Sequence, residues 1–119
     1  MSVGPSGELY LTGAPLSALN TFRVWRSLSA REPAQTPAFE QNVPVNLGGV
    51  LVFNNGGPNP AGLLGQAWIA TDHSGGLTQG NVYVLCSVDP PGIDPQDVFL
   101  IRSTDAGLTW SPPVRVNND

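Results

Sequence analysis

A thiol and an imidazole are the first side chains of this sequence that could do chemistry. Cys86 is the only cysteine, so no disulfide can form within the chain, and it lies in the apolar run from Val82 to Val88. A cysteine in such a run usually behaves as a small buried hydrophobic residue, so we expect no catalytic or redox role. His73 is the only histidine and has no second nitrogen or sulfur ligand nearby in the sequence, which favours a solvated turn residue over a metal ligand.

Three carboxylates, those of Asp89, Asp94 and Asp97, lie in one acidic segment. A calcium site is the alternative that such a segment suggests. Three prolines stiffen residues 89–97, however, and the spacing of the carboxylates matches no calcium-binding loop, so we favour turn formation. We therefore predict no metal and no other cofactor.

The segment from Ser103 to Trp110 is the most specific pattern in the chain. Asp105 can accept hydrogen bonds from backbone amides across a hairpin, and Gly107 permits a positive φ where the chain reverses. Thr109 can begin the outgoing strand, and the ring of Trp110 can cover the turn. The pattern predicts a tight turn held together by its own side chains.

The elements around this turn are predicted to be strands. The 119 residues are 40% hydrophobic, and 14 Gly and 12 Pro divide the backbone into short segments, which is typical of an all-β domain. The apolar runs predict strands near Glu8–Leu11, Phe22–Ser27, Phe39–Asn46, Val50–Phe53, Ala67–Asp72, Asn81–Cys86, Val98–Ser103 and Thr109–Val116.

The composition also excludes some partners. A formal charge of −4 and the absence of lysine leave no basic patch for a phosphate backbone, so we expect no nucleic acid. No stretch approaches the roughly 20 apolar residues of a membrane span, and the N-terminus does not resemble a secretion signal. The expected location is therefore cytoplasmic by default.

The two ends of the chain resemble each other. Residues 7–11 read like residues 80–84, residues 22–27 read like residues 98–103, and residues 42–46 read like residues 113–117, so the period is about 75 residues including the loops. We expect one copy in residues 1–46, a connection rich in Gly, Pro and Asn in 47–66, and a second copy in 67–119. The first copy should lack most of its first strand, because only Met1 to Ser6 precede Gly7.

The pattern Ser-x-Asp-x-Gly-x-Thr-Trp at residues 103–110 resembles the Asp-box, or BNR repeat, of sialidases and related β-propellers. The resemblance covers residues 67–119 well and residues 7–46 loosely, since the first copy keeps Ser27 but has Ser29 in place of the aspartate. It implies an all-β fold of about two antiparallel four-stranded blades. It also implies that the box is structural and lies between the third and fourth strands. We therefore expect no catalytic role for Asp105 and little contribution from Ser29.

Sialidases gather an arginine cluster, a tyrosine nucleophile with a supporting glutamate, and an acid/base aspartate from several blades, and two blades cannot supply all of these. Arg23 faintly resembles one of those arginines, but the repeat places it in an ordinary third strand. Tyr10 and Tyr83 are equivalent in the two copies, which indicates a repeated packing residue. The sequence therefore predicts no catalytic residue.

In the blades that this resemblance implies, the loops after the second and fourth strands would share one face. We expect that face to carry Asn54, Asn55, Asp89 and Asp94 as candidate binding groups.

Three functions stay open at this point. The favoured one is a non-catalytic propeller fragment that assembles with copies of itself or with a partner chain, because two blades leave broad outer faces uncovered. The others are a carbohydrate- or protein-binding module that uses the loop face and a sialidase that is active only as an oligomer.

Overall fold

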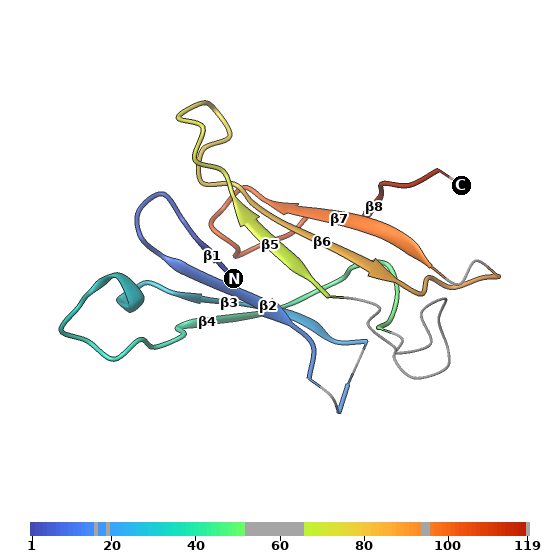
Figure 1. Cartoon of the computed structure of the whole chain (residues 1–119), viewed down its shortest axis with the longest axis horizontal. Coiled ribbons are helices and arrows are strands. Elements are labelled where there is room, and N and C mark those ends of the chain that lie inside the picture. Colours follow the sequence, from blue (N-terminus) through green and yellow to red (C-terminus); the bar gives the residue numbers. More distant parts are fainter. Residues whose placement is uncertain (16, 19, 52–65, 94–95, 119) are drawn as a thin grey trace.

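The computed structural model describes residues 1–15, 17–18, 20–51, 66–93 and 96–118 of the chain. These residues form two antiparallel four-stranded sheets, and their one helical element is the 3-10 turn η1 (Ser29–Arg31). Figure 1 shows the sheets stacked on one another, the first in blue to cyan and the second in yellow to red. The expectation of an all-β protein is confirmed.

The strands follow one another in sheet order. The first sheet contains β1 (Ser2–Val3), β2 (Leu9–Gly13), β3 (Phe22–Ser27) and β4 (Gln41–Val45), in that order. The second contains β5 (Trp68–Thr71), β6 (Val82–Val88), β7 (Asp97–Ser103) and β8 (Val114–Arg115).

Six of the predicted strands agree with observed strands to within two residues at each end, and two differ more widely. The predicted strand Thr109–Val116 is reduced to β8, because the turn includes Thr109 and because Pro112 and Pro113 have no N–H to donate to a ladder. Of the predicted strand Val50–Phe53, Val50 forms an isolated bridge with Asp89, and residues 52 and 53 lie outside the described residues.

Both sheets pair their strands in the same register. Tyr10 lies opposite Arg26 in the first sheet, and Tyr83 lies opposite Arg102 in the second. Gly7 and Gly80 precede these strands with φ of 87° and 83°, a left-handed conformation that glycine adopts without steric cost. The first strands differ in length, since β1 has 2 residues and β5 has 4.

Each sheet has two distinct faces, because successive residues of a strand point to opposite sides. We call the face that carries Tyr10 in the first sheet and Tyr83 in the second the tyrosine face. The opposite face, which carries Ser27 in the first sheet and Ser103 in the second, is the serine face.

The core lies where the tyrosine face of the first sheet meets the serine face of the second. Phe22 and Val24 from the first sheet pack in one cluster with Val82, Val84 and Ile101 from the second. All five are at most 1% exposed. Burial of side chains of this size contributes about 1.5 to 3 kcal/mol each, so this interface stabilises the fold.

The inner edges of the two sheets are also joined by polar groups. The hydroxyl of Thr71 on β5 donates to the carbonyl oxygen of Val3 at 2.7 Å, and it lies 2.9 Å from the hydroxyl of Ser2 on β1. Figure 1 accordingly shows β5 beside β1. Within the part of the chain that the structure describes, no helix is long and apolar enough to cross a membrane.

Candidate functional site

The turn that follows β7 is held by three of its own side chains. The Asp105 carboxylate accepts hydrogen bonds from the backbone N–H of Thr109 at 2.9 Å, the Thr109 hydroxyl at 2.5 Å and the Ser103 hydroxyl at 2.8 Å. These bonds favour the ionised form, so the Thr109 hydroxyl and N–H hold the pKa of Asp105 at about 2. The expected use of Asp105 as an acceptor across the hairpin is confirmed.

The backbone of this turn reverses through two left-handed residues. Ala106 has φ of 58° and Gly107 has φ of 85°. The N–H of Gly107 donates to the Ser103 hydroxyl at 2.8 Å, and the indole N–H of Trp110 donates to the Gly107 carbonyl at 3.1 Å. The expected positive φ of Gly107 and the expected position of Trp110 over the turn are both observed.

This turn also joins the two sheets. The Arg26 guanidinium on β3 donates a hydrogen bond of 2.8 Å to the carbonyl oxygen of Ala106, and the amide of Gln41 on β4 donates to the carbonyl oxygen of Gly107. The hydroxyl of Tyr10 lies 3.5 Å from the Ala106 carbonyl oxygen. The turn of the second sheet therefore binds to three polar side chains of the first sheet. We call these residues, Tyr10, Arg26 and Gln41, the socket.

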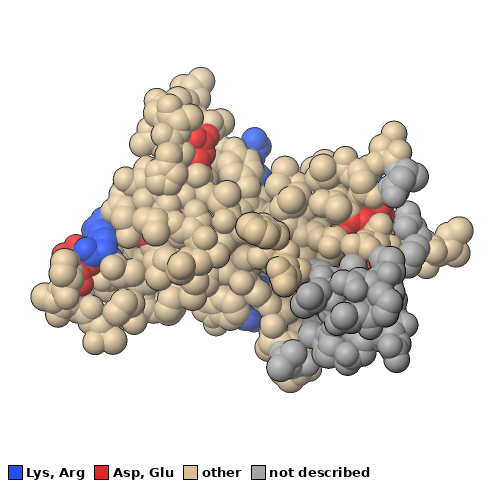
Figure 2. Space-filling view, viewed as in Figure 1, with Lys and Arg blue, Asp and Glu red and all other residues tan. Residues whose placement is uncertain are grey.

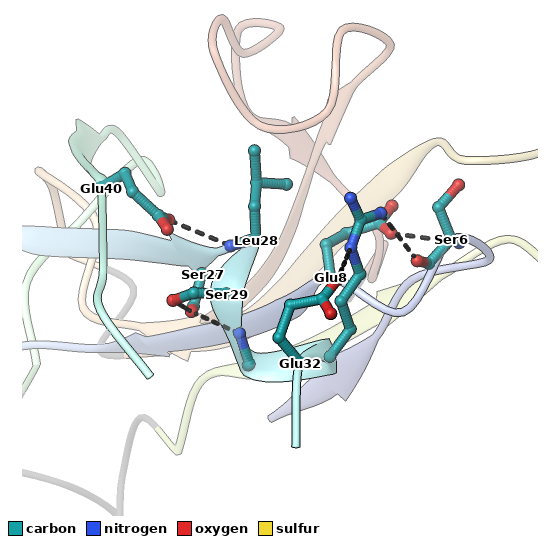
Figure 3. A network of polar contacts seen from close by, with 9 residues as sticks. Ser6, Glu8, Ser27, Leu28, Ser29, Glu32 and Glu40 are labelled. Atoms are coloured by element: carbon teal, nitrogen blue, oxygen red, sulfur yellow. Dashed lines mark hydrogen bonds and ion pairs between the residues drawn. The ribbon is translucent and has the colours of Figure 1, made fainter. Parts of the chain in front are cut away.

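The corresponding turn of the first sheet, after Ser27, uses other residues for the same purpose (Figure 3). The Ser29 hydroxyl accepts the N–H of Ala38 at 2.8 Å and lies 3.3 Å from the Ser27 hydroxyl, the arrangement that Asp105 has with Thr109 and Ser103. Glu40 accepts the N–H of Leu28 at 3.0 Å. These bonds revise the expectation that Ser29 contributes little, because it provides the bond that the aspartate provides in the second sheet.

The two tyrosines share a register position but not an environment. Tyr10 is fully buried between the sheets, and burial together with the nearby Glu8 carboxylate raises its pKa. Tyr83 lies half-buried on the tyrosine face of the second sheet, where its hydroxyl accepts a bond of 3.3 Å from Asn81. A raised pKa and an inaccessible hydroxyl are the opposite of what a tyrosine nucleophile needs.

Four of the five arginines have separate partners. Arg23 donates to the Asn42 side chain at 2.5 Å, which ties it to the neighbouring strand as the structural interpretation expects. Arg26 holds the turn described above. Arg31 pairs with Glu32 at 3.3 Å, and Arg115 pairs with Asp97 at 2.7 Å.

The Cys86 thiol lies in the core, and the His73 imidazole contacts β1. Cys86 is 1% exposed in the core, and burial raises the pKa of its thiol to about 12. His73 has a ring nitrogen 2.8 Å from the Val3 carbonyl oxygen and 3.1 Å from the Thr71 hydroxyl, so it joins the first hairpin of the second sheet to β1. His73 is exposed in the turn between β5 and β6, as the expected solvated turn residue should be, and its contact with β1 is an addition that the sequence does not predict.

The candidate loop face is described only in part. Asn54, Asn55 and Asp94 lie outside the described residues. Asp89 is half-buried, and its backbone exchanges two hydrogen bonds of 2.9 Å with Val50. Among the residues that the structure does describe, no three histidine, cysteine, aspartate or glutamate side chains are grouped as metal ligands.

Each sheet packs against the other through one face only. Its opposite face has no second sheet packed on it among the described residues. On the tyrosine face of the second sheet, Trp68 is 69% exposed, Val114 is 60% exposed and Leu85 is 37% exposed. The serine face of the first sheet carries Val3, Leu9, Leu11 and Trp25, all of them partly or largely exposed. Figure 2 shows few charged side chains on the face in view, with positive and negative groups side by side at its left end.

A groove of about 320 Å³ lies on the tyrosine face of the second sheet. Its lining includes Tyr83, Leu100, Arg102, Ser111 and Val114. The contacts of the socket residues Arg26 and Gln41 and the position of Arg102 in the groove are not predictable from local sequence patterns. The one available signal was the repeat, which aligns Arg26 with Arg102.

No family model, curated protein or solved structure matches this chain. The resemblance to sialidase-like propellers that the Ser103–Trp110 segment and the repeat suggest therefore has no support from these comparisons.

Proposed function

We propose that this chain is a non-catalytic assembly module, made of about two sialidase-like propeller blades, whose function is to associate with copies of itself through its uncovered sheet faces. The observation that carries the proposal is the way in which the two sheets pack. The tyrosine face of one meets the serine face of the other, so unlike faces are in contact.

This packing leaves one face of each kind uncovered. The serine face of the first sheet and the tyrosine face of the second are the counterparts, by register, of the two faces that already form the core. Stacking a second chain in the same manner would bury Trp68, Leu85 and Val114, which are exposed in the single chain. Exposed apolar surface of this kind marks an interaction site.

An interface between unlike faces is heterologous, so repeated stacking gives either a closed ring or an open filament. Three chains of two blades would make a six-bladed ring, the number found in sialidases. A back-to-back dimer would instead place like faces together, which the packing within the chain does not do.

The non-catalytic part of the proposal is supported by the environments of the candidate residues. Tyr10 is buried with a raised pKa, and Arg23 is bonded to Asn42. Asp105 is bonded within its own turn. None of these groups is placed to attack or protonate a glycoside.

Light scattering on the pure chain at micromolar concentration tests the assembly. We expect a folded species with a mass above 12.5 kDa, the mass of one chain. A well-folded species that stays at the mass of a single chain would overturn the proposal. A fluorogenic sialoside, incubated with the assembled protein, tests the second part, and measurable turnover would show that the module is catalytic after all.

A further inference from the structure

Two polar side chains of the first sheet contact the same carbonyl group in the second sheet. Arg26 and Tyr10 lie directly opposite each other on the tyrosine face of the first sheet. Both direct their polar ends to the carbonyl oxygen of Ala106, in the turn of the second sheet. A tyrosine and an arginine that lie opposite each other in this way therefore form a binding site for a backbone carbonyl in the turn after the third strand of the neighbouring sheet. We call this pair of side chains the receptor.

The second sheet carries the same pair on its uncovered face. Tyr83 and Arg102 lie directly opposite each other, as Tyr10 and Arg26 do. Arg102 is exposed, and both side chains line the groove of about 320 Å³ together with Leu100 and Val114. The receptor is thus repeated at a place where the described part of the chain has no third sheet to occupy it.

We infer that this groove is the docking site for the 28–40 turn of a second copy of the chain. The inference rests on the proposed assembly and identifies its contact. The 28–40 turn follows the third strand of the first sheet, as residues 104–113 follow the third strand of the second. It is therefore the element that would meet Tyr83 and Arg102 if chains stack as the sheets do.

The chemistry of the turn suits the groove. Ala30 follows Ser27 by three residues, as Ala106 follows Ser103, so its carbonyl group corresponds to the one that Arg26 binds. Residues 28–40 carry one arginine and two glutamates, a net charge of −1 that complements Arg102. Leu28 and Phe39 are 42% and 40% exposed and offer apolar surface to Leu100 and Val114.

Association measured by sedimentation tests the contact, with Arg102→Ala and Tyr83→Ala compared with the wild-type chain. We expect each substitution to weaken association by about tenfold or more, because it removes one of the two side chains that would bind the turn. Leu77→Ala is the matched control, since Leu77 is fully exposed on the hairpin between β5 and β6 and does not line the groove. It should leave association unchanged.

Cross-linking between two singly substituted proteins tests the direction of the contact. Val114→Cys in one protein and Ala30→Cys in the other should be joined by a short bismaleimide when the proteins are mixed. Neither protein should be joined efficiently to itself. The native Cys86 does not interfere, because it is buried and its thiol has a raised pKa.

The outcomes separate the two proposals. A wild-type chain that never associates overturns the assembly and the docking site together. A chain that associates equally well with Arg102→Ala and Tyr83→Ala keeps the assembly and overturns the docking site. Efficient cross-linking of Val114→Cys to itself, with none between the mixed proteins, shows that like faces meet and also overturns it.

Discussion

The guanidinium of Arg26, on the third strand of the first sheet, donates a hydrogen bond of 2.8 Å to the carbonyl oxygen of Ala106, 80 residues later in the chain. The acceptor lies in a turn that Asp105 and Ser103 already hold in shape. A local motif in one sheet thereby becomes the contact surface for the other. Loss of either the local bonds or the long-range bond should weaken the same interface.

Replacing Arg26 with alanine should lower the free energy of unfolding by about 1 to 3 kcal/mol, because it removes a charged donor and leaves the Ala106 carbonyl without it. Urea unfolding at several protein concentrations measures the loss and separates it from association. Arg102→Ala is the matched control, since Arg102 occupies the same register position but is exposed. Its intrinsic stability should stay within about 0.5 kcal/mol of wild type, and equal losses at both positions would contradict the role of Arg26.

Replacing Asp105 with alanine should lower the free energy of unfolding by about 1 to 3 kcal/mol, because Thr109 and Ser103 lose their acceptor. Ser29→Ala in the first sheet should also cost stability, since the N–H of Ala38 loses the hydroxyl to which it donates. The cost should be the smaller of the two, because the neutral Ser29 hydroxyl accepts this one bond whereas the charged Asp105 carboxylate accepts three. An unchanged melting temperature for Asp105→Ala would show that the turn does not need its carboxylate.

The carboxylate of Asp105 should make stability depend on pH in acid. Its pKa is about 2 in the folded chain and near 3.9 in an unfolded one, so its contribution is fully present above about pH 5 and is lost as the pH falls toward 2. The difference in unfolding free energy between wild type and Asp105→Asn should therefore shrink over that range. Denaturant titrations at a series of pH values measure it, and parallel profiles for the two proteins would argue against the carboxylate.

Replacing Gly49 with alanine should disrupt the connection between the sheets. A Cβ at this position would overlap the carbonyl oxygen of Asp89, part of the backbone bridge with Val50, so the bridge must open or shift. We expect a loss of about 1 to 3 kcal/mol in thermal or urea unfolding. Gly13→Ala is the control, because a Cβ there meets nothing within 4 Å, and it should stay within about 1 kcal/mol of wild type. Equal effects would show that steric overlap is not the cause.

The local features of this protein are predictable from its sequence. Phe22–Ser27 is predicted and observed as a strand with the same bounds, because alternation of side chains and turn residues is read over a few positions. The roles of Asp105, Gly107 and Trp110 were also readable, since their partners lie within six residues of each other along the chain. The repeat alignment of Tyr10 with Tyr83 agrees with the strand register for the same reason.

The different environments of these equivalent residues follow from how the two sheets pack. Tyr10 is buried and Tyr83 lies in an open groove, although their strands read alike. The second sheet covers the tyrosine face of the first, and no sheet among the described residues covers that of the second. The same packing gives Arg26 a partner 80 residues away and leaves Arg102 exposed. Burial depends on which surfaces meet in space, and the pattern within a strand carries no information about a surface contributed by a distant part of the chain.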